Sequence, residues 1–187
     1  MPAANTILED WNGLERETAM KTILPCNGSR AWAIGMVKLR PLQTPQQLFA
    51  AADKVWQELP ETDWQQAFDS HPRLGESKAN STTAQSLRWS AGEQSAAKLD
   101  GATQAALAEA NRAYEAKFGR IFILCATGRS AAEVFAILEQ RLRCDAATEL
   151  REAAEQQRLI TQLRLRKWLQ LPTLTCAELA STSNSGA

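Results

Sequence analysis

Residues 145–170 read DAATELREAAEQQRLITQLRLRKWLQ and predict one long helix. The pattern begins at Asp145 and ends before Pro172, because proline cannot continue a helix. Ile160, Leu163 and Trp168 recur on one side of this helix and form an apolar stripe. A stripe of this kind is typical of a helix that packs within a bundle.

Three other segments show helical patterns with recognisable ends. Residues 44–59, TPQQLFAAADKVWQEL, have Thr44 as the N-cap and Pro45 at the first helical position. Residues 101–119 carry an apolar stripe and end at a glycine, and residues 130–142 begin with the Ser-x-x-Glu of a capping box. Most of the sequence therefore predicts helix, and we expect an all-α, single-domain, multi-helix bundle.

One segment departs from the helical pattern. Residues 120–128, RIFILCATG, contain a continuous apolar run that is equally typical of a buried strand. A lone strand would have no pairing partner, so we predict a buried extended segment near residues 120–127. Its amide and carbonyl groups need hydrogen-bond partners, and binding a ligand is one way to supply them.

The composition limits the function. The chain has 187 residues, enough for one full core, and we expect a domain over residues 1–170 followed by a flexible C-terminal tail over 171–187. Lys plus Arg and Asp plus Glu both number 21, a balance that argues against nucleic-acid binding. No apolar run is long enough for a membrane helix, and the start of the chain lacks a signal-peptide pattern. We therefore expect a cytoplasmic protein.

The cysteines agree with that location. Cys26, Cys125, Cys144 and Cys176 are widely separated and form no C-x-x-C pair. Because the chain has a single histidine, these residues do not predict a metal site. Reduced structural thiols are the expectation for a cytosolic protein.

The single histidine lies in the stretch FDSHPRLGE, residues 68–76. Pro72 disfavours the helical conformation for His71 and stiffens the loop that carries it. One interpretation is a histidine that caps a helix or faces water. The other is an acid–base group that projects into a cavity, since the imidazole pKa lies near neutral pH.

Two further polar groups allow a structural and a functional interpretation. Ser90 and Glu93, in SAGEQ, have the spacing of a capping box, but the carboxylate can also turn toward His71. Arg164 borders the apolar stripe of the last helix, where arginines often extend toward solvent. Alternatively, its planar guanidinium holds a carboxylate or a urea-like group.

An ordered series of blocks, CNGSRAWA, RPLQTPQQL, SHPRLGE, SAGEQ, LAEANRAYEAKFG, FILCATG, LEQRL, TEL and ITQLRL, resembles the OHCU decarboxylases. These are the 2-oxo-4-hydroxy-4-carboxy-5-ureidoimidazoline decarboxylases of urate breakdown. The resemblance covers roughly residues 7–170, and the number and order of the blocks make it specific. It implies an all-helical, cofactor-free homodimer that converts OHCU to (S)-allantoin and CO2.

The resemblance also implies which residues act. It assigns His71, Glu93 and Arg164 as the catalytic set. The substrate-binding residues that it implies are Pro72, Ser90, Ala91, Gly92, Gln94, Phe122, Ile123, Leu124, Cys125 and Ala126. Cys144 replaces the usual asparagine of the family, and Arg120 replaces an aromatic or aliphatic residue. Neither position belongs to the predicted site.

The chemistry agrees with the absence of a cofactor motif. The C=N bond next to the carboxyl-bearing carbon of OHCU can accept the electron pair, so we predict no cofactor and no metal. Two alternative functions remain. The first is a hydrolase or isomerase that acts on a related ureido-imidazole. The second is a helical protein-interaction module, which would have an exposed apolar stripe and no enclosed polar pocket.

Overall fold

The computed structural model describes residues 5–73 and 101–183, and the side chains of residues 5–73 and 105–181. Every regular element within these ranges is a helix, which confirms the all-α class. The elements are α1 (Thr6–Gly13), α2 (Arg16–Ile23), the 3-10 helix η1 (Leu24–Cys26), α3 (Arg30–Lys38), α4 (Pro45–Gln57), α5 (Glu61–Asp69), α7 (Gly101–Phe118), α8 (Ala131–Arg141), α9 (Ala146–Trp168) and α10 (Cys176–Ser183). None of these helices is long and apolar enough to cross a membrane.

The helix starts that the sequence predicts are confirmed. The Thr44 hydroxyl accepts a hydrogen bond from the Gln47 amide at 3.2 Å, and α4 begins directly after it. Ser130 and Glu133 form the reciprocal capping box that starts α8. Asp145 caps α9 by accepting hydrogen bonds from two amides of the first turn. Local sequence signals thus fix where these helices begin.

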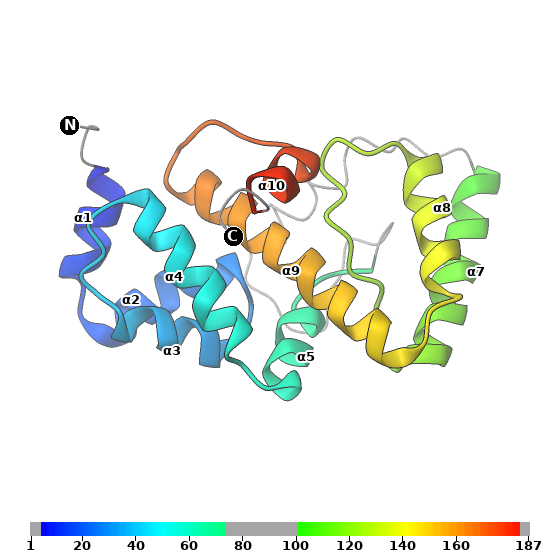
Figure 1. The fold of residues 1–187 in the computed structure, drawn as a ribbon, viewed down its shortest axis with the longest axis horizontal. Coiled ribbons are helices and arrows are strands. Elements are labelled where there is room, and N and C mark those ends of the chain that lie inside the picture. Colours follow the sequence, from blue (N-terminus) through cyan, green and yellow to red (C-terminus); the bar gives the residue numbers. More distant parts are fainter. Residues whose placement is uncertain (1–4, 74–100, 184–187) are drawn as a thin grey trace.

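Helix α9 is the central element of the fold (Figure 1). Its 23 residues span about 34 Å. Helices α1 to α4 gather around its C-terminal half, whereas α7 and α8 lie near its N-terminal end (Figure 1). Helices α4, α5, α10 and η1 all contact α9. One helix therefore connects groups of side chains that are far apart in the sequence.

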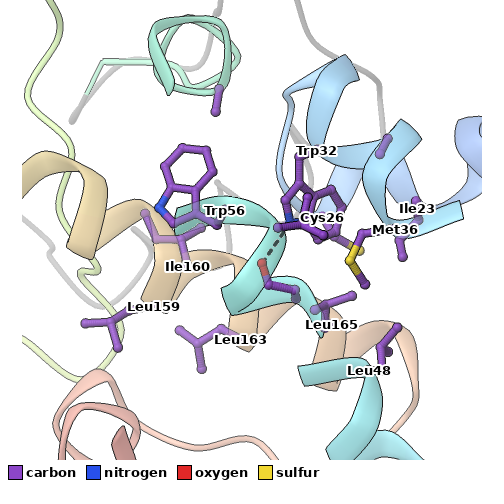
Figure 2. Packing of buried hydrophobic residues seen from close by; sticks show 14 of the residues in the cluster. Ile23, Cys26, Trp32, Met36, Leu48, Trp56, Leu159, Ile160, Leu163 and Leu165 are labelled. Atoms are coloured by element: carbon purple, nitrogen blue, oxygen red, sulfur yellow. Dashed lines mark hydrogen bonds between the residues drawn. The ribbon is translucent and has the colours of Figure 1, made fainter. Parts of the chain in front are cut away.

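The main hydrophobic core lies between α9 and the N-terminal helices (Figure 2). Trp32, Leu48 and Leu163 are among its fully buried side chains. The indole nitrogen of Trp32 donates to the Ala52 carbonyl at 3.1 Å, so this large ring is buried without an unpaired donor. Helix α4 packs on α9 at this side, and α3 packs in turn on α4, so the apolar stripe predicted for the last helix faces this core.

Residues 121–126 form the buried extended segment that the sequence predicts. Side chains of an extended backbone alternate between two faces, and here both faces are apolar. Phe122, Leu124 and Ala126 join a second core with α7 and α8, while Ile123 and Cys125 join the main core. The continuous apolar run is explained by this burial on two sides.

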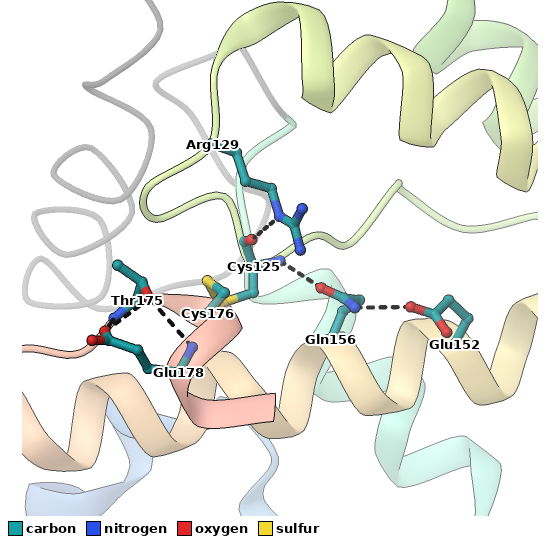
Figure 3. Close-up of a disulfide and its surroundings, with 7 residues drawn as sticks. All are labelled: Cys125, Arg129, Glu152, Gln156, Thr175, Cys176 and Glu178. Carbon is teal, nitrogen blue, oxygen red and sulfur yellow. Dashed lines mark hydrogen bonds between the residues drawn. A yellow bond between two sulfur atoms is a disulfide. The ribbon is translucent and has the colours of Figure 1, made fainter. Parts of the chain in front are cut away.

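The state of the cysteines corrects the sequence-based expectation. Cys125, in the extended segment, forms a disulfide with Cys176 at the start of α10 (Figure 3). Cys26 and Cys144 are free thiols. A pairing between residues 51 positions apart is set by the fold, and spacing along the chain does not reveal it. The expectation of four reduced thiols was wrong for this pair.

Helix α10 lies within residues 171–187, the range for which the sequence predicts a flexible tail. Cys176 and Leu179 are buried, and α10 packs on α9. The Thr175 hydroxyl accepts from the Glu178 amide, and the Glu178 carboxylate accepts from the Thr175 amide at 2.7 Å. This capping box, visible in the sequence as TCAE, is the signal that would have predicted the helix. The domain boundary at residue 170 stays a prediction.

We expect Cys176→Ser to lower the free energy of unfolding by about 3 kcal/mol, because the disulfide closes a long loop and restricts the unfolded chain. Urea unfolding with and without a reductant measures this loss. Reductant should destabilise the wild type by the same amount and leave the variant unchanged. Cys144→Ser, which removes a free thiol, is the control and should behave like the wild type. A wild-type protein insensitive to reductant would contradict the prediction.

Candidate functional site

His71 lies two residues after the end of α5 and is buried, with 9% of its surface exposed. Its amide donates to the Phe68 carbonyl at 3.0 Å, and its Nε2 lies 2.8 Å from the Gln157 Oε1 of α9. The interpretation of His71 as a histidine that faces water is therefore wrong. Pro72, the residue after His71, is also buried. Arg73 connects the same loop to α7 by donating two hydrogen bonds to Glu115.

Gln157, the partner of His71, belongs to a buried polar network. Its Nε2 donates to the Asn27 carbonyl at 3.1 Å. The Asn27 side chain donates to the Thr161 hydroxyl at 3.0 Å, and that hydroxyl donates to the Gln157 carbonyl at 2.9 Å. The Oε1 and the Nε2 of Gln157 thus both have hydrogen-bond partners, which fixes the amide group in one orientation.

Gly28 permits the close approach of this network to the histidine loop. It has φ +98°, a conformation that favours glycine, and a Cβ at this position would lie 2.1 Å from the Ser70 Oγ. Any other residue would push the loop after η1 away from the end of α5. The glycine of the block CNGS therefore brings Asn27 and His71 to the same part of the molecule.

Arg164 lies on the same side of α9, seven residues or two helical turns beyond Gln157. Its side chain is fully buried, and Nη1 donates to the Pro25 carbonyl at 3.4 Å. The interpretation of Arg164 as an arginine that extends to solvent is therefore wrong. Burial raises the pKa of the neighbouring Cys26 thiol to about 12, so Cys26 is a protonated thiol near neutral pH.

The residues predicted as the site are thus partly brought together. His71 is linked to the short segment 25–27 through hydrogen bonds of Gln157. Arg164 donates a hydrogen bond to the same segment directly. Five predicted positions lie outside the described residues: Ser90, Ala91, Gly92, Glu93 and Gln94. The convergence of Glu93 on His71 and Arg164 stays a prediction.

The extended segment is held by side chains of its neighbours (Figure 3). The Cys125 amide donates to the Gln156 Oε1 at 3.0 Å, and the Cys125 carbonyl accepts from the Arg129 Nε at 3.2 Å. Gln156 is next to Gln157 on α9, so the segment is attached one residue from the partner of His71. Residues 122–126 are all buried, and the substrate-lining role that the resemblance implies for them stays a prediction.

A buried ion pair supports the same segment. The Arg141 Nε donates to both carboxylate oxygens of Glu149 at 3.0 Å, and its Nη1 donates to the Ile123 carbonyl at 2.6 Å. The Tyr114 hydroxyl donates to Glu149, and burial raises the pKa of Tyr114 above its ordinary value, which keeps the hydroxyl protonated. The Arg141 guanidinium also lies 4.7 Å from the centre of the Phe122 ring.

Sequence reasoning missed the supporting residues Asn27, Arg141, Glu149 and Gln157. Arg141 and Glu149 lie in the blocks LEQRL and TEL, where a leucine follows each of them. Gln157 had a signal of its own, because its spacing from Arg164 puts both on one face of the helix. Asn27 was detectable only as part of the block CNGSRAWA.

A pocket between α4, α9 and α10 lies on another side of α9. Its lining is Phe49, Ala50, Asp53, Arg158, Gln162, Arg166 and Leu179. The Asp53 carboxylate accepts from Arg158 at 2.9 Å and from Gln162 at 2.7 Å. Burial raises the pKa of Asp53, although these two partners act in the opposite direction. None of the predicted site residues that the structure describes lines this pocket.

Within the described residues, no cluster of histidine, cysteine or acidic side chains could hold a metal ion.

Comparison with known proteins identifies the class to which this helical architecture belongs. The family model described as OHCU decarboxylase matches residues 12–166. The chain belongs to the OHCU decarboxylase family.

The chain is also similar to two particular proteins. The chain is 35% identical over 161 residues to the uric acid degradation bifunctional protein TTL of Arabidopsis thaliana, a match covering 85% of this chain and 50% of the relative. It is 30% identical over 138 residues to the 2-oxo-4-hydroxy-4-carboxy-5-ureidoimidazoline decarboxylase of Amia calva, covering 71% and 77% of the two chains. This chain thus spans about half the length of the bifunctional plant relative.

Two solved structures share the fold. An OHCU decarboxylase crystallised in the presence of (S)-allantoin has a TM-score of 0.70 and 34% identity, over 84% of this chain and 99% of that chain. An (S)-allantoin synthase has a TM-score of 0.66 over 86% of this chain and 53% of that chain. Its identity is 20%, so this second likeness supports the fold alone.

Proposed function

We propose that this chain is a cofactor-independent carboxy-lyase that converts OHCU to (S)-allantoin and CO2 in urate degradation. The observation that carries the proposal is the likeness, over nearly the whole of the other chain, to an OHCU decarboxylase crystallised with (S)-allantoin. The buried His71 and Arg164, both near segment 25–27, add chemical support. An acid–base group and a fixed cation are what a decarboxylation of this substrate needs from a protein.

The reaction can proceed with the substrate as its own electron acceptor. The bond from the ring carbon to the carboxylate breaks, CO2 leaves, and the adjacent C=N bond takes up the electron pair. The ring nitrogen that received the pair takes a proton from water, the hydroxyl loses its proton to become a carbonyl, and a proton is delivered to one face of the neighbouring ring carbon. The protein has to orient the ring, exclude water and move these protons.

We assign the roles accordingly. His71 exchanges protons with the substrate hydroxyl and with the developing carbanionic carbon. Arg164 holds substrate oxygens through its planar, permanently charged guanidinium. Glu93 orients the ureido and ring N–H groups. The remaining cage consists of Pro72, Ser90, Ala91, Gly92, Gln94, Phe122, Ile123, Leu124, Cys125 and Ala126.

The direct test uses freshly generated OHCU. The purified protein should release CO2 faster than the uncatalysed decay and should give (S)-allantoin, which circular dichroism detects. Uncatalysed decay is expected to give racemic allantoin. A hydrolase or isomerase of a related ureido-imidazole would consume its substrate without releasing CO2, and racemic product at the uncatalysed rate would refute the proposal.

The interaction-module alternative is disfavoured by the surface. It requires an exposed apolar stripe, yet across residues 5–73 and 105–181 the one large apolar side chain that is exposed is Leu39, at 42%. A homodimer is the assembly that the resemblance implies. Location in the cytoplasm stays a prediction, and the Cys125–Cys176 disulfide now weakens the argument for it.

A further inference from the structure

The orientation of the Gln157 amide determines which nitrogen of His71 carries a proton. Gln157 Nε2 lies 3.1 Å from the carbonyl oxygen of Asn27. A carbonyl oxygen only accepts, so the amide nitrogen has to face Asn27 and the amide oxygen has to face His71. Gln157 Oε1 also only accepts, and it lies 2.8 Å from the imidazole Nε2. Nε2 is therefore the donor in this hydrogen bond.

We infer that Gln157 is a positioning residue that holds His71 in the Nε2–H tautomer, so that Nδ1 is the nitrogen that takes up and releases the proton in the reaction. This inference rests on the proposed function of His71 and deepens it. In a neutral imidazole one nitrogen carries the proton and the other carries the lone pair. When Nε2 is the donor, the basic lone pair belongs to Nδ1.

The hydroxyl proton and the carbon proton pass through one atom, while the ring nitrogen that takes up the electron pair receives a proton from water. Neutral His71 accepts a proton from the substrate hydroxyl at Nδ1 and becomes imidazolium. It then returns a proton from Nδ1 to the ring carbon, while the Nε2–H stays bonded to the Gln157 oxygen throughout. A neutral amide oxygen stabilises the imidazolium without competing for its proton, which a carboxylate at the same place would do.

The surroundings keep this arrangement fixed. Gln157 is fully buried, and Asn27, Gln157 and Thr161 bond to one another in a closed set. Turning the amide over would place its oxygen against the Asn27 carbonyl oxygen, and both atoms can only accept. The buried hydrogen bond to Asn27 would be lost, at a cost of roughly 1–3 kcal/mol for each unsatisfied group.

The test exploits the presence of a single histidine in the chain. Long-range ¹H–¹⁵N correlation spectra of protein labelled with ¹⁵N-histidine report the tautomer of His71 without assignment ambiguity. The neutral wild type should show a protonated Nε2 and an unprotonated Nδ1. Gln157→Met keeps the side-chain size but removes the acceptor, so its spectrum should move toward a mixture of tautomers.

Kinetics give the second readout. Gln157→Met should lower kcat for OHCU by about 10- to 100-fold with little change in KM, as is common when the outer partner of a functional imidazole is lost. Gln162→Met, on the same helix but bonded to Phe49 and Asp53, is the matched control. It should retain the wild-type tautomer and kcat. Far-UV circular dichroism of both variants confirms that they are folded.

The two proposals fail separately. A wild-type protein that decarboxylates OHCU but carries its neutral proton on Nδ1 overturns this inference and leaves the proposed function standing. A wild-type protein with no decarboxylase activity overturns the proposed function and the catalytic half of the inference, whichever tautomer is found. An unchanged tautomer and kcat in Gln157→Met also overturn the positioning role, and the wild-type spectrum decides the tautomer even if that variant does not fold.

Discussion

His71→Asn should lower kcat for OHCU decarboxylation by about 10²- to 10⁴-fold, the usual effect of removing a general acid–base group. Asparagine is polar and of similar reach, but it does not titrate and so cannot carry the proton from the hydroxyl to the ring carbon. The variant should remain folded, because His71 lies beyond the end of α5, where a change of side chain interrupts no helix. Steady-state kinetics and product chirality measure the loss.

Ser70→Ala is the matched control for the histidine variant. Ser70 is adjacent and also buried, and its hydroxyl donates to the Ala67 carbonyl at 2.7 Å at the end of α5. Losing that bond should cost stability of about 1 kcal/mol and leave kcat near the wild-type value. If His71→Asn were to turn over OHCU at the rate of Ser70→Ala, the proton-carrier role would have to be abandoned.

The sequence predicts the helical skeleton well because its signals are local. Thr44, Ser130 and Asp145 each cap a helix within three residues of themselves, and the structure confirms all three. The extended segment was also predictable, because a short continuous apolar run that ends at a glycine is typical of a buried strand. Its burial on both faces explains why the run shows no alternation.

Long-range relations were harder to predict. The Cys125–Cys176 disulfide forms because α10 packs on α9 beside the extended segment. The positions of the four cysteines in the sequence do not predict this packing. Helix α10 itself was missed although Thr175 and Glu178 have capping-box spacing, because the small polar residues after it resemble a frayed end. In this region the tertiary contact, together with the cap, outweighs composition.

Within the candidate site, residue types were more predictable than their supports. His71 and Arg164 were found as isolated polar residues near apolar patterns, and the family resemblance gave them roles. Their burial, and the glutamine that joins His71 to α9, follow only from packing. Gln157 is uncharged and so does not stand out in the sequence. The one sequence signal for its role is its spacing of seven residues from Arg164, which places both side chains on one face of the helix.

The second large effect is a loss of stability, expected when the buried Arg141–Glu149 ion pair is broken. Glu149→Leu should lower the free energy of unfolding by about 3–5 kcal/mol, because it leaves the Arg141 charge buried without its partner. Urea unfolding measures the loss. Glu17→Leu, which breaks an exposed i,i+4 pair with Lys21, is the control and should change stability little.

The double variant Arg141→Met/Glu149→Leu separates stability from positioning. Replacing both charges by apolar groups removes the uncompensated charge, so most of the lost unfolding free energy should return. The Ile123 carbonyl, however, still lacks the Arg141 donor that holds it at 2.6 Å. If the extended segment lines the substrate site, OHCU turnover by the double variant should stay well below that of the wild type although the protein is stable. Full recovery of both stability and turnover would show that the ion pair supports the fold and has no part in placing the segment.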